Sequence, residues 1–245
     1  MAFVYVFILL ACILASVILH EFGHYLAARS CGIIPEEFNI GFGPKLFGFY
    51  KAGTDWNVRL IMLGGSNEFK KKSQAQLDAL PVQKQIHIIA AGIETNLVLA
   101  LVSWLIYTAQ RGLTLMQGII TYGKMIAMIM PSTISAIVEF CAPGAESDIT
   151  AMHATGSLLA QSSMSMLLIT VMLFSAMNAI LGVTNLIPIP AMDGGQIVLR
   201  IPALFHHPLS KEAMNKAIMT SFYIMIGCTV AYIMRDVMLY LVSLL

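Results

Sequence analysis

Two histidines and a glutamate near the start of the sequence have the spacing of a metal-dependent hydrolytic site. His20, Glu21 and His24 form a His-Glu-x-x-His sequence. Residues four apart share one face of a helix, so both imidazoles can bind the same ion, with the glutamate beside it. Zinc with three protein ligands and one open position activates water, and a neighbouring glutamate can act as general base. We therefore predict one catalytic Zn²⁺ per chain, with Glu21 as the catalytic residue.

The third zinc ligand has to come from a distant part of the chain, and Asp193 is the best candidate. It lies in the segment Asn-Leu-Ile-Pro-Ile-Pro-Ala-Met-Asp-Gly-Gly, residues 185–195. The two prolines end the preceding helix and the two glycines allow tight turns, so an irregular segment offers the carboxylate. Irregular backbone at membrane depth is tolerated only where it is buried or lines a cavity. The alternative is an ordinary exposed aspartate in a helix-ending turn.

Glu94 is the rival for the third ligand, because an acid within a predicted membrane-spanning helix is functional by default. It could instead be neutral and hydrogen-bonded to Thr95, Asn96 or another helix. The remaining histidines are expected at the membrane interface or in solvated loops. They are His87, His153, His206 and His207.

The composition indicates a multi-span membrane protein. Only 11% of the 245 residues are charged and 58% are apolar, whereas soluble domains average about 25% charged residues. A soluble fold of this size could not cover its surface with so few polar groups. Lys and Arg number 14 against 13 Asp and Glu, which leaves no basic surface for nucleic acid. The four cysteines form no Cys-x-x-Cys pair, so neither a disulfide framework nor a thiolate zinc site is expected.

Apolar runs predict an α-helical polytopic membrane protein with about four transmembrane helices, at residues 2–28, 85–108, 163–187 and 217–242. A cleaved signal peptide is the less favoured alternative for the first run, because no basic residue precedes it. Residues 113–140 are also apolar, but Lys124 and Pro131 interrupt them. We expect an interfacial or re-entrant segment there. The chain as a whole, 1–245, is expected to form a single domain.

Basic residues predict the orientation in the membrane. Eight Lys and Arg lie between the first and second spans, but only Arg111 and Lys124 lie between the second and third. Loops rich in Lys and Arg stay on the cytoplasmic side. Three further basic residues between the third and fourth spans agree. We therefore expect the metal site towards the cytoplasm and both termini on the extracytoplasmic side.

The region between the first two spans is predicted to be β-structure. Glycines are frequent in residues 38–69, and apolar residues such as Phe38, Ile40 and Phe42 alternate with others. A β-hairpin or small sheet is expected there.

Several segments resemble the site-2 protease family of intramembrane zinc metalloproteases. The resemblance rests on His-Glu-Phe-Gly-His in a first transmembrane helix and on residues 185–195 after a later one. Residues 31–44 and 63–65 resemble the bacterial branch that cleaves anti-sigma factors, the regulator-of-sigma-E proteases. The similarity runs along most of the chain.

The resemblance implies an endopeptidase of the bacterial cytoplasmic membrane. Such an enzyme hydrolyses a peptide bond within or near the transmembrane segment of its substrate, for example an anti-sigma factor or a signal-peptide remnant. Zinc is implied at His20, His24 and Asp193, catalysis at Glu21, and substrate binding at Asn185 and Asn96.

The β-region also has an implied role. In the family it forms a membrane-associated β-structure, and an exposed strand edge can accept the backbone groups of an unwound substrate. We expect that edge at residues 57–62. The alternative is a hairpin that packs on the core and binds nothing.

The chain departs from the family pattern at two places. Residues 111–158 leave no room for the PDZ domain that this branch usually carries, and residues 91–96 read Ala-Gly-Ile-Glu-Thr-Asn where the family has Ala-Gly-Pro-x-x-Asn.

Two other functions remain open. A catalytically silent membrane scaffold predicts loss of a ligand or of the glutamate. A metal transporter predicts His and acidic residues on successive helices.

Overall fold

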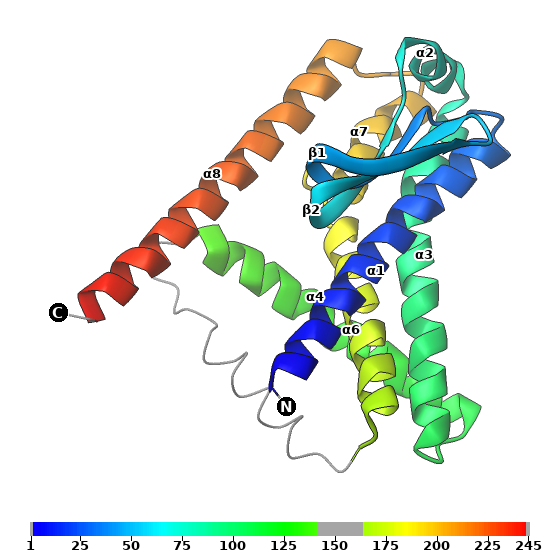
Figure 1. Cartoon of the computed structure of the whole chain (residues 1–245). Helices are drawn as coiled ribbons and strands as arrows, with labels where there is room; N and C mark the ends of the chain where they lie inside the picture. The colour runs from blue at the N-terminus through cyan, green and yellow to red at the C-terminus, as the bar shows by residue number, and fades with distance from the viewer. Residues whose placement is uncertain (1, 142–163, 244–245) are drawn as a thin grey trace.

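The computed structural model describes residues 2–141 and 164–243, and it is a mainly helical chain with one small sheet (Figure 1). This confirms the predicted α-helical polytopic class with β-structure between the first two spans. The elements, in chain order, are α1 (Ala2–Ser30), β1 (Glu37–Lys51), β2 (Thr54–Glu68), α2 (Lys71–Ala79), α3 (Val82–Gln110), α4 (Leu115–Cys141), α6 (Met166–Leu186), α7 (Asp193–Leu204) and α8 (Lys211–Ser243).

Within the described residues, five helices are long and apolar enough to cross a membrane. Four of them, in α1, α3, α6 and α8, coincide with the predicted spans. The fifth, Leu115–Ile137 in α4, has a mean hydropathy of 1.2, the lowest of the five. Figure 1 shows that α4 runs obliquely to α1, α3 and α6. Its expected interfacial or re-entrant placement stays a prediction.

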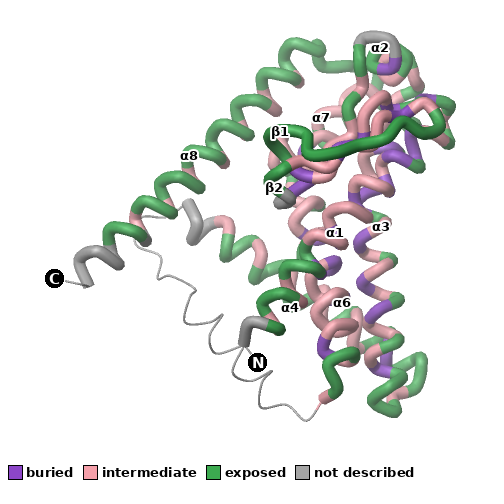
Figure 2. Tube along the Cα trace, in the orientation of Figure 1, coloured by how far each residue is buried: buried purple, intermediate pink, exposed green. Residues whose placement is uncertain are grey.

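The three helices α1, α3 and α6 pack side by side through small and polar residues. Ala100 and Ala179 are fully buried, and the Asn178 side-chain amide donates to the Ser16 hydroxyl at 2.8 Å. Small side chains let helix backbones approach closely, and polar groups away from water need such partners. Many of the buried residues accordingly lie along these three helices, whereas α8 is exposed or half-buried wherever its side chains are described (Figure 2). The bundle α1–α3–α6 is therefore the frame of the protein.

The strands β1 and β2 pair with each other along several segments, because both are long and bent. Residues 45–51 pair with residues 54–59, and residues 37–40 pair both with 55–58 and with 65–68. Residues 65–68 have 37–40 as their only strand partner among the described residues, so they are an edge of the sheet.

The expected edge at residues 57–62 is therefore wrong for its first part. Asn57 pairs with both Asn39 and Gly48, and Val58 pairs with both Ile40 and Phe47. Two parts of β1, residues 39–40 and 47–48, therefore cover both sides of this segment.

An aromatic cluster attaches the sheet to the helix that carries the histidines. Trp56 lies 4.7 Å from Phe38 and 5.0 Å from Tyr25, measured between ring centroids. Phe22 stacks on Tyr25 at 5.7 Å. Such edge and stacked contacts add to the free energy gained by burying the rings. The sheet is thus held directly beside the second half of α1.

Candidate active site

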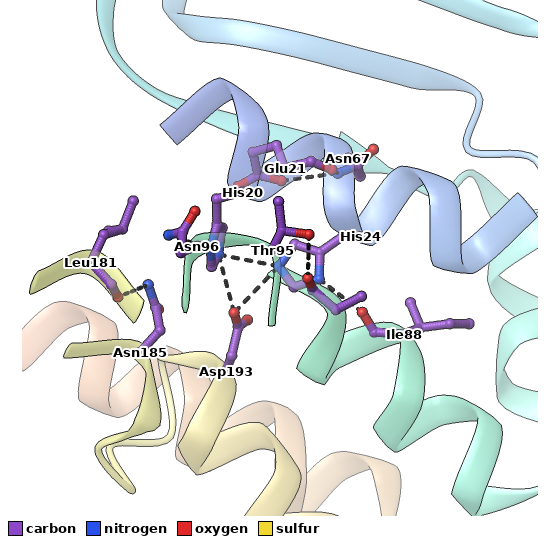
Figure 3. A network of polar contacts seen from close by, with 11 residues as sticks. His20, Glu21, His24, Asn67, Ile88, Thr95, Asn96, Leu181, Asn185 and Asp193 are labelled. Carbon is purple, nitrogen blue, oxygen red and sulfur yellow. Dashed lines mark hydrogen bonds and ion pairs between the residues drawn. The ribbon is translucent and has the colours of Figure 1, made fainter. Parts of the chain in front are cut away.

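Three side chains from two distant helices converge at one point. The His20 Nε2 and His24 Nε2 atoms, both on α1, lie 3.1 and 3.3 Å from Asp193 Oδ2 at the first residue of α7 (Figure 3). The two Nε2 atoms are 3.2 Å apart. Among the described residues, this is the single group of His, Cys, Asp and Glu that could hold a metal ion.

The other ring nitrogens of the histidines point away from this centre and have their own partners. His24 Nδ1 lies 2.8 Å from the carbonyl oxygen of Ile88. Because a carbonyl only accepts, Nδ1 carries the proton and Nε2 presents a lone pair. A hydrogen bond of this kind is what orients a metal-binding histidine.

Asn96 contacts the Nδ1 atom of His20, as the Ile88 carbonyl contacts the Nδ1 atom of His24. Its side-chain amide lies 3.2 Å from His20 Nδ1, and its Oδ1 is buried without a hydrogen-bond partner. The oxygen and nitrogen of an amide are assigned from the partners that they meet. Exchanging them lets Oδ1 accept a hydrogen bond from the Nδ1–H of His20, which satisfies the buried oxygen and leaves the Nε2 lone pair facing Asp193. Asn96, which the resemblance implied as a substrate-binding residue, therefore contacts a histidine.

This donor set fits a zinc ion. With both rings protonated on Nδ1, two imidazole lone pairs and a carboxylate oxygen face one another, and Asp193 Oδ2 has no hydrogen-bond donor. Three acceptors at contact repel unless a cation lies between them. Zinc bonds of about 2.0–2.1 Å in a tetrahedron separate neighbouring ligand atoms by roughly 3.3 Å. The distances of 3.1–3.3 Å between the three atoms agree with that spacing.

Three glycines make room for this arrangement. A Cβ atom on Gly92 of α3 would overlap His24 Nε2 and lie 2.7 Å from His20 Cε1. Cβ atoms on Gly194 and Gly195 would overlap the carbonyl oxygens of Leu186 and Ile189, respectively. The chain between α6 and α7 can therefore fold back tightly enough to bring Asp193 to the histidines only because these positions lack side chains.

Glu21 lies next to the three ligands and is held by the sheet. The Asn67 side-chain amide donates to the Glu21 carboxylate at 2.9 Å and to the Glu21 backbone carbonyl at 2.8 Å. Sequence reasoning missed Asn67, since an asparagine in a strand carries no local signal of a distant partner.

A cavity of about 610 Å³ opens onto the metal-binding group and Glu21. Its wall comes from α1, the edge of β2, α2, α3, the end of α6, α7 and the start of α8. Besides the three ligands and Glu21, its polar lining includes Asn67, Gln74, Gln85, Asn185, Gln196 and Arg200.

The remaining predicted residues lie as follows. Asn185 lines the cavity, and its amide donates to the Leu181 carbonyl at 3.0 Å. Glu94, the rival ligand, is exposed on α3 and is not part of the metal-binding group. His87, His206 and His207 are exposed, and His153 lies outside the described residues.

The chain is similar to known zinc metalloproteases. The model of peptidase family M50 matches residues 8–228. The regulator of sigma E protease of Haemophilus influenzae is 36% identical over 142 residues, which cover 53% of this chain and 30% of that protein. The zinc metalloprotease RasP of Geobacillus kaustophilus is 53% identical over 51 residues, which cover 21% and 12% of the two chains.

The chain spans less than a third of the length of the curated relatives that it matches. The family match, by contrast, extends over most of the chain, from the first helix into α8. The chain belongs to peptidase family M50, the site-2 protease family of zinc metalloproteases.

Proposed function

We propose that this chain is a zinc-dependent intramembrane endopeptidase that hydrolyses a peptide bond within or near the transmembrane segment of a membrane protein. The observation that carries the proposal is the convergence of His20 Nε2, His24 Nε2 and Asp193 Oδ2 in a cavity that also contains Glu21. The silent-scaffold alternative predicts loss of one of these four residues, and all four are present. The transporter alternative needs several such groups, and the described residues hold one.

In this proposal His20, His24 and Asp193 hold the zinc ion. When bound, zinc supplies Lewis-acid chemistry, which activates water and polarises a carbonyl. Glu21 accepts the proton of the attacking water and delivers it to the leaving amine. Asn67 keeps the Glu21 carboxylate in place for both transfers. Asn185, on the cavity wall, hydrogen-bonds the extended substrate backbone.

The substrate binds as an added strand along residues 65–68. This edge has a strand partner on one side, and it lies beside the catalytic glutamate, because a Cβ atom on Gly65 would be 2.8 Å from Glu21 Cγ. A peptide bond in a helix is shielded by its own turn, and strand addition satisfies the backbone groups that unwinding frees. Anti-sigma factors and signal-peptide remnants have the required transmembrane or apolar segments.

The protein is proposed to lie in the bacterial cytoplasmic membrane with the metal site towards the cytoplasm. The support is the excess of Lys and Arg between the first two spans. Cysteines replacing the exposed Lys84 and Lys211 should both be labelled from the cytoplasmic side. Labelling of either position from the opposite side only would contradict this orientation.

The proposed activity is tested with purified protein in proteoliposomes that also contain a single-span substrate. Cleavage should require zinc, stop after chelation and return when zinc is added back. The Asp193→Ala variant should lose both zinc and cleavage. Cleavage that persists after complete removal of zinc would contradict the proposal.

A further inference from the structure

Arg200 places a positive charge on the wall of the active-site cavity. Its side chain is half-buried and lines the same cavity as the metal-binding group. The guanidinium donates from Nε to the Gln85 side-chain oxygen at 3.2 Å and from one terminal nitrogen to the Gln196 backbone carbonyl at 3.0 Å. Both partners are neutral, and a guanidinium has five N–H donors. Its charge is thus held in place by neutral groups, and these two hydrogen bonds use only two of its five N–H donors.

No carboxylate among the described residues forms an ion pair with Arg200. The carboxylate of Asp78 acts on it electrostatically, but that group already accepts from Lys211 at 2.7 Å and from Gln74 at 2.9 Å. Burial lowers the pKa of Arg200, which is the sign of a charge that has lost water without gaining a close counter-ion. A partly buried charge is costly until it is paired.

The position of Arg200 relative to the metal-binding group follows from α7. Asp193 and Arg200 are seven residues apart on one helix, so they share a face and lie about 10 Å apart along its axis. The hydrogen bond to Gln196, one turn back, brings the guanidinium closer to Asp193 than that. An extended peptide rises about 3.3 Å per residue. A chain with its scissile bond at the metal site therefore reaches the guanidinium in two or three residues.

We propose, on the basis of the proposed function, that Arg200 forms an anion subsite that binds an Asp or Glu side chain two or three residues from the bond that is hydrolysed. The neutral partners Gln85 and Gln196 hold the guanidinium ready, and the substrate supplies the carboxylate that the described part of the protein does not. The enzyme would then select transmembrane segments whose juxtamembrane end is acidic.

The test uses matched transmembrane peptides that carry either Glu or Gln at one position, scanned from one to four residues on each side of the cleavage site. The measured quantity is the ratio of kcat/KM for the Glu and Gln peptides. A charge-assisted hydrogen bond predicts a ratio of about 10 for the native enzyme at the second or third position. The ratio should fall to about 1 in Arg200→Gln. In Arg200→Glu, a Lys peptide should be preferred over the Glu peptide.

The control variant is Lys84→Gln, which removes an exposed positive charge one residue before Gln85. It should keep the native ratio. A ratio near 1 at every position in the native enzyme would overturn the proposal, as would an Arg200→Gln variant that keeps the native ratio. An equal loss for Glu and Gln peptides in Arg200→Gln would also overturn it, because Arg200 would then act only by fixing α7 or by binding a lipid phosphate.

Binding to the Glu21→Gln protein, measured with fluorescent peptides, separates this proposal from the proposed function. If the native enzyme cleaves none of the peptides, the protease proposal fails for them, yet the affinity ratio still decides the anion subsite. Tighter binding of the Glu peptide that depends on Arg200 supports the subsite. Equal affinities in the protein with intact Arg200 refute it.

Discussion

One amide group joins Asn67 of β2 to Glu21 of α1 at two points. Its nitrogen donates to the Glu21 carboxylate at 2.9 Å and to the backbone carbonyl of the same residue at 2.8 Å. Both partners are acceptors, so the orientation of the amide is fixed. Asn67 also belongs to the strand edge at residues 65–68. The proposed substrate-binding strand therefore also holds the proposed general base in place.

Replacing Asn67 by Ala should lower kcat about tenfold, because a carboxylate that loses one charge-assisted hydrogen bond and its second anchor spends less time in the productive position. Zinc content should stay at one per chain, since Asn67 touches none of the three ligands. Asn67→Asp should be worse, because it sets a carboxylate against Glu21. Steady-state kinetics with metal analysis measures both effects.

The control for Asn67 is Asn215→Ala, an exposed asparagine on the wall of the same cavity. It should retain near-native kcat. If Asn67→Ala raises KM alone and leaves kcat unchanged, the amide serves substrate binding and does not position Glu21.

Gly92→Ala should abolish tight zinc binding. The added methyl group would overlap His24 Nε2 and lie 2.7 Å from His20 Cε1, so at least one imidazole has to leave the centre. Gly123→Ala, at a helical glycine with nothing within 4 Å of the new atom, is the matched control and should bind zinc normally. Zinc titration of both purified variants gives the answer, and native affinity in Gly92→Ala would show that the histidines do not hold the ion as described.

The identity of the third ligand can be decided by one pair of variants. Asp193→Ala should lose bound zinc, whereas Glu94→Gln should keep it, because Glu94 is exposed on α3 and lies outside the metal-binding group. Elemental analysis of both proteins measures this directly. Retained zinc in Asp193→Ala together with loss in Glu94→Gln would transfer the ligand to Glu94.

The ion pair between Asp78 and Lys211 should make a small, pH-dependent contribution to stability. Burial alone would raise the pKa of Asp78, but hydrogen bonds from Lys211 and Gln74 outweigh it and hold the pKa below its usual value. A depressed folded pKa stabilises the protein above the unfolded pKa of about 3.9, and this is lost as the pH falls through the folded pKa. Because Lys211 is 70% exposed, the gain is at most about 1 kcal/mol.

Asp78→Asn should accordingly lower the melting temperature in detergent at pH 7 and leave it unchanged at a pH below the folded pKa of Asp78. High salt should reduce the difference at pH 7. Glu212→Gln, which removes an exposed acid one residue after Lys211, is the control and should show no such pH dependence. A destabilisation by Asp78→Asn that persists at low pH would mean that the carboxylate is not bound as an anion.

The sequence predicts the parts of the site that depend on local spacing. The interval of His20 and His24 follows from the helical repeat, and Asp193 follows from the prolines and glycines around it. Asn67, Gly92 and Arg200 come from other elements, and their partners are 46, 68 and more than 100 positions away along the chain. Only the packed fold brings such residues together.

The sequence is least informative about which face of a helix a residue occupies and which strand lies at the edge of a sheet. An acid in a span reads as functional, yet Glu94 and the buried Asn96 are two residues apart on a helix, about 200° around its axis, so they face opposite ways. Alternation of apolar residues in 38–69 predicts strands but not their neighbours, so it does not place an edge at residues 57–62. The bend that sets residues 37–40 between two parts of β2 depends on long-range pairing.

The most direct test of a zinc endopeptidase with Glu21 as general base is parallel measurement of zinc content and cleavage in the native protein and Glu21→Gln. Both are reconstituted with the same single-span substrate, and products are identified by mass spectrometry. We predict one zinc in each protein, a cut within or near the transmembrane segment by the native protein, and about a thousandfold slower cleavage by Glu21→Gln, the middle of a general base's contribution of roughly 10²–10⁴. Cleavage by Glu21→Gln at the native rate, with zinc bound, would contradict the account.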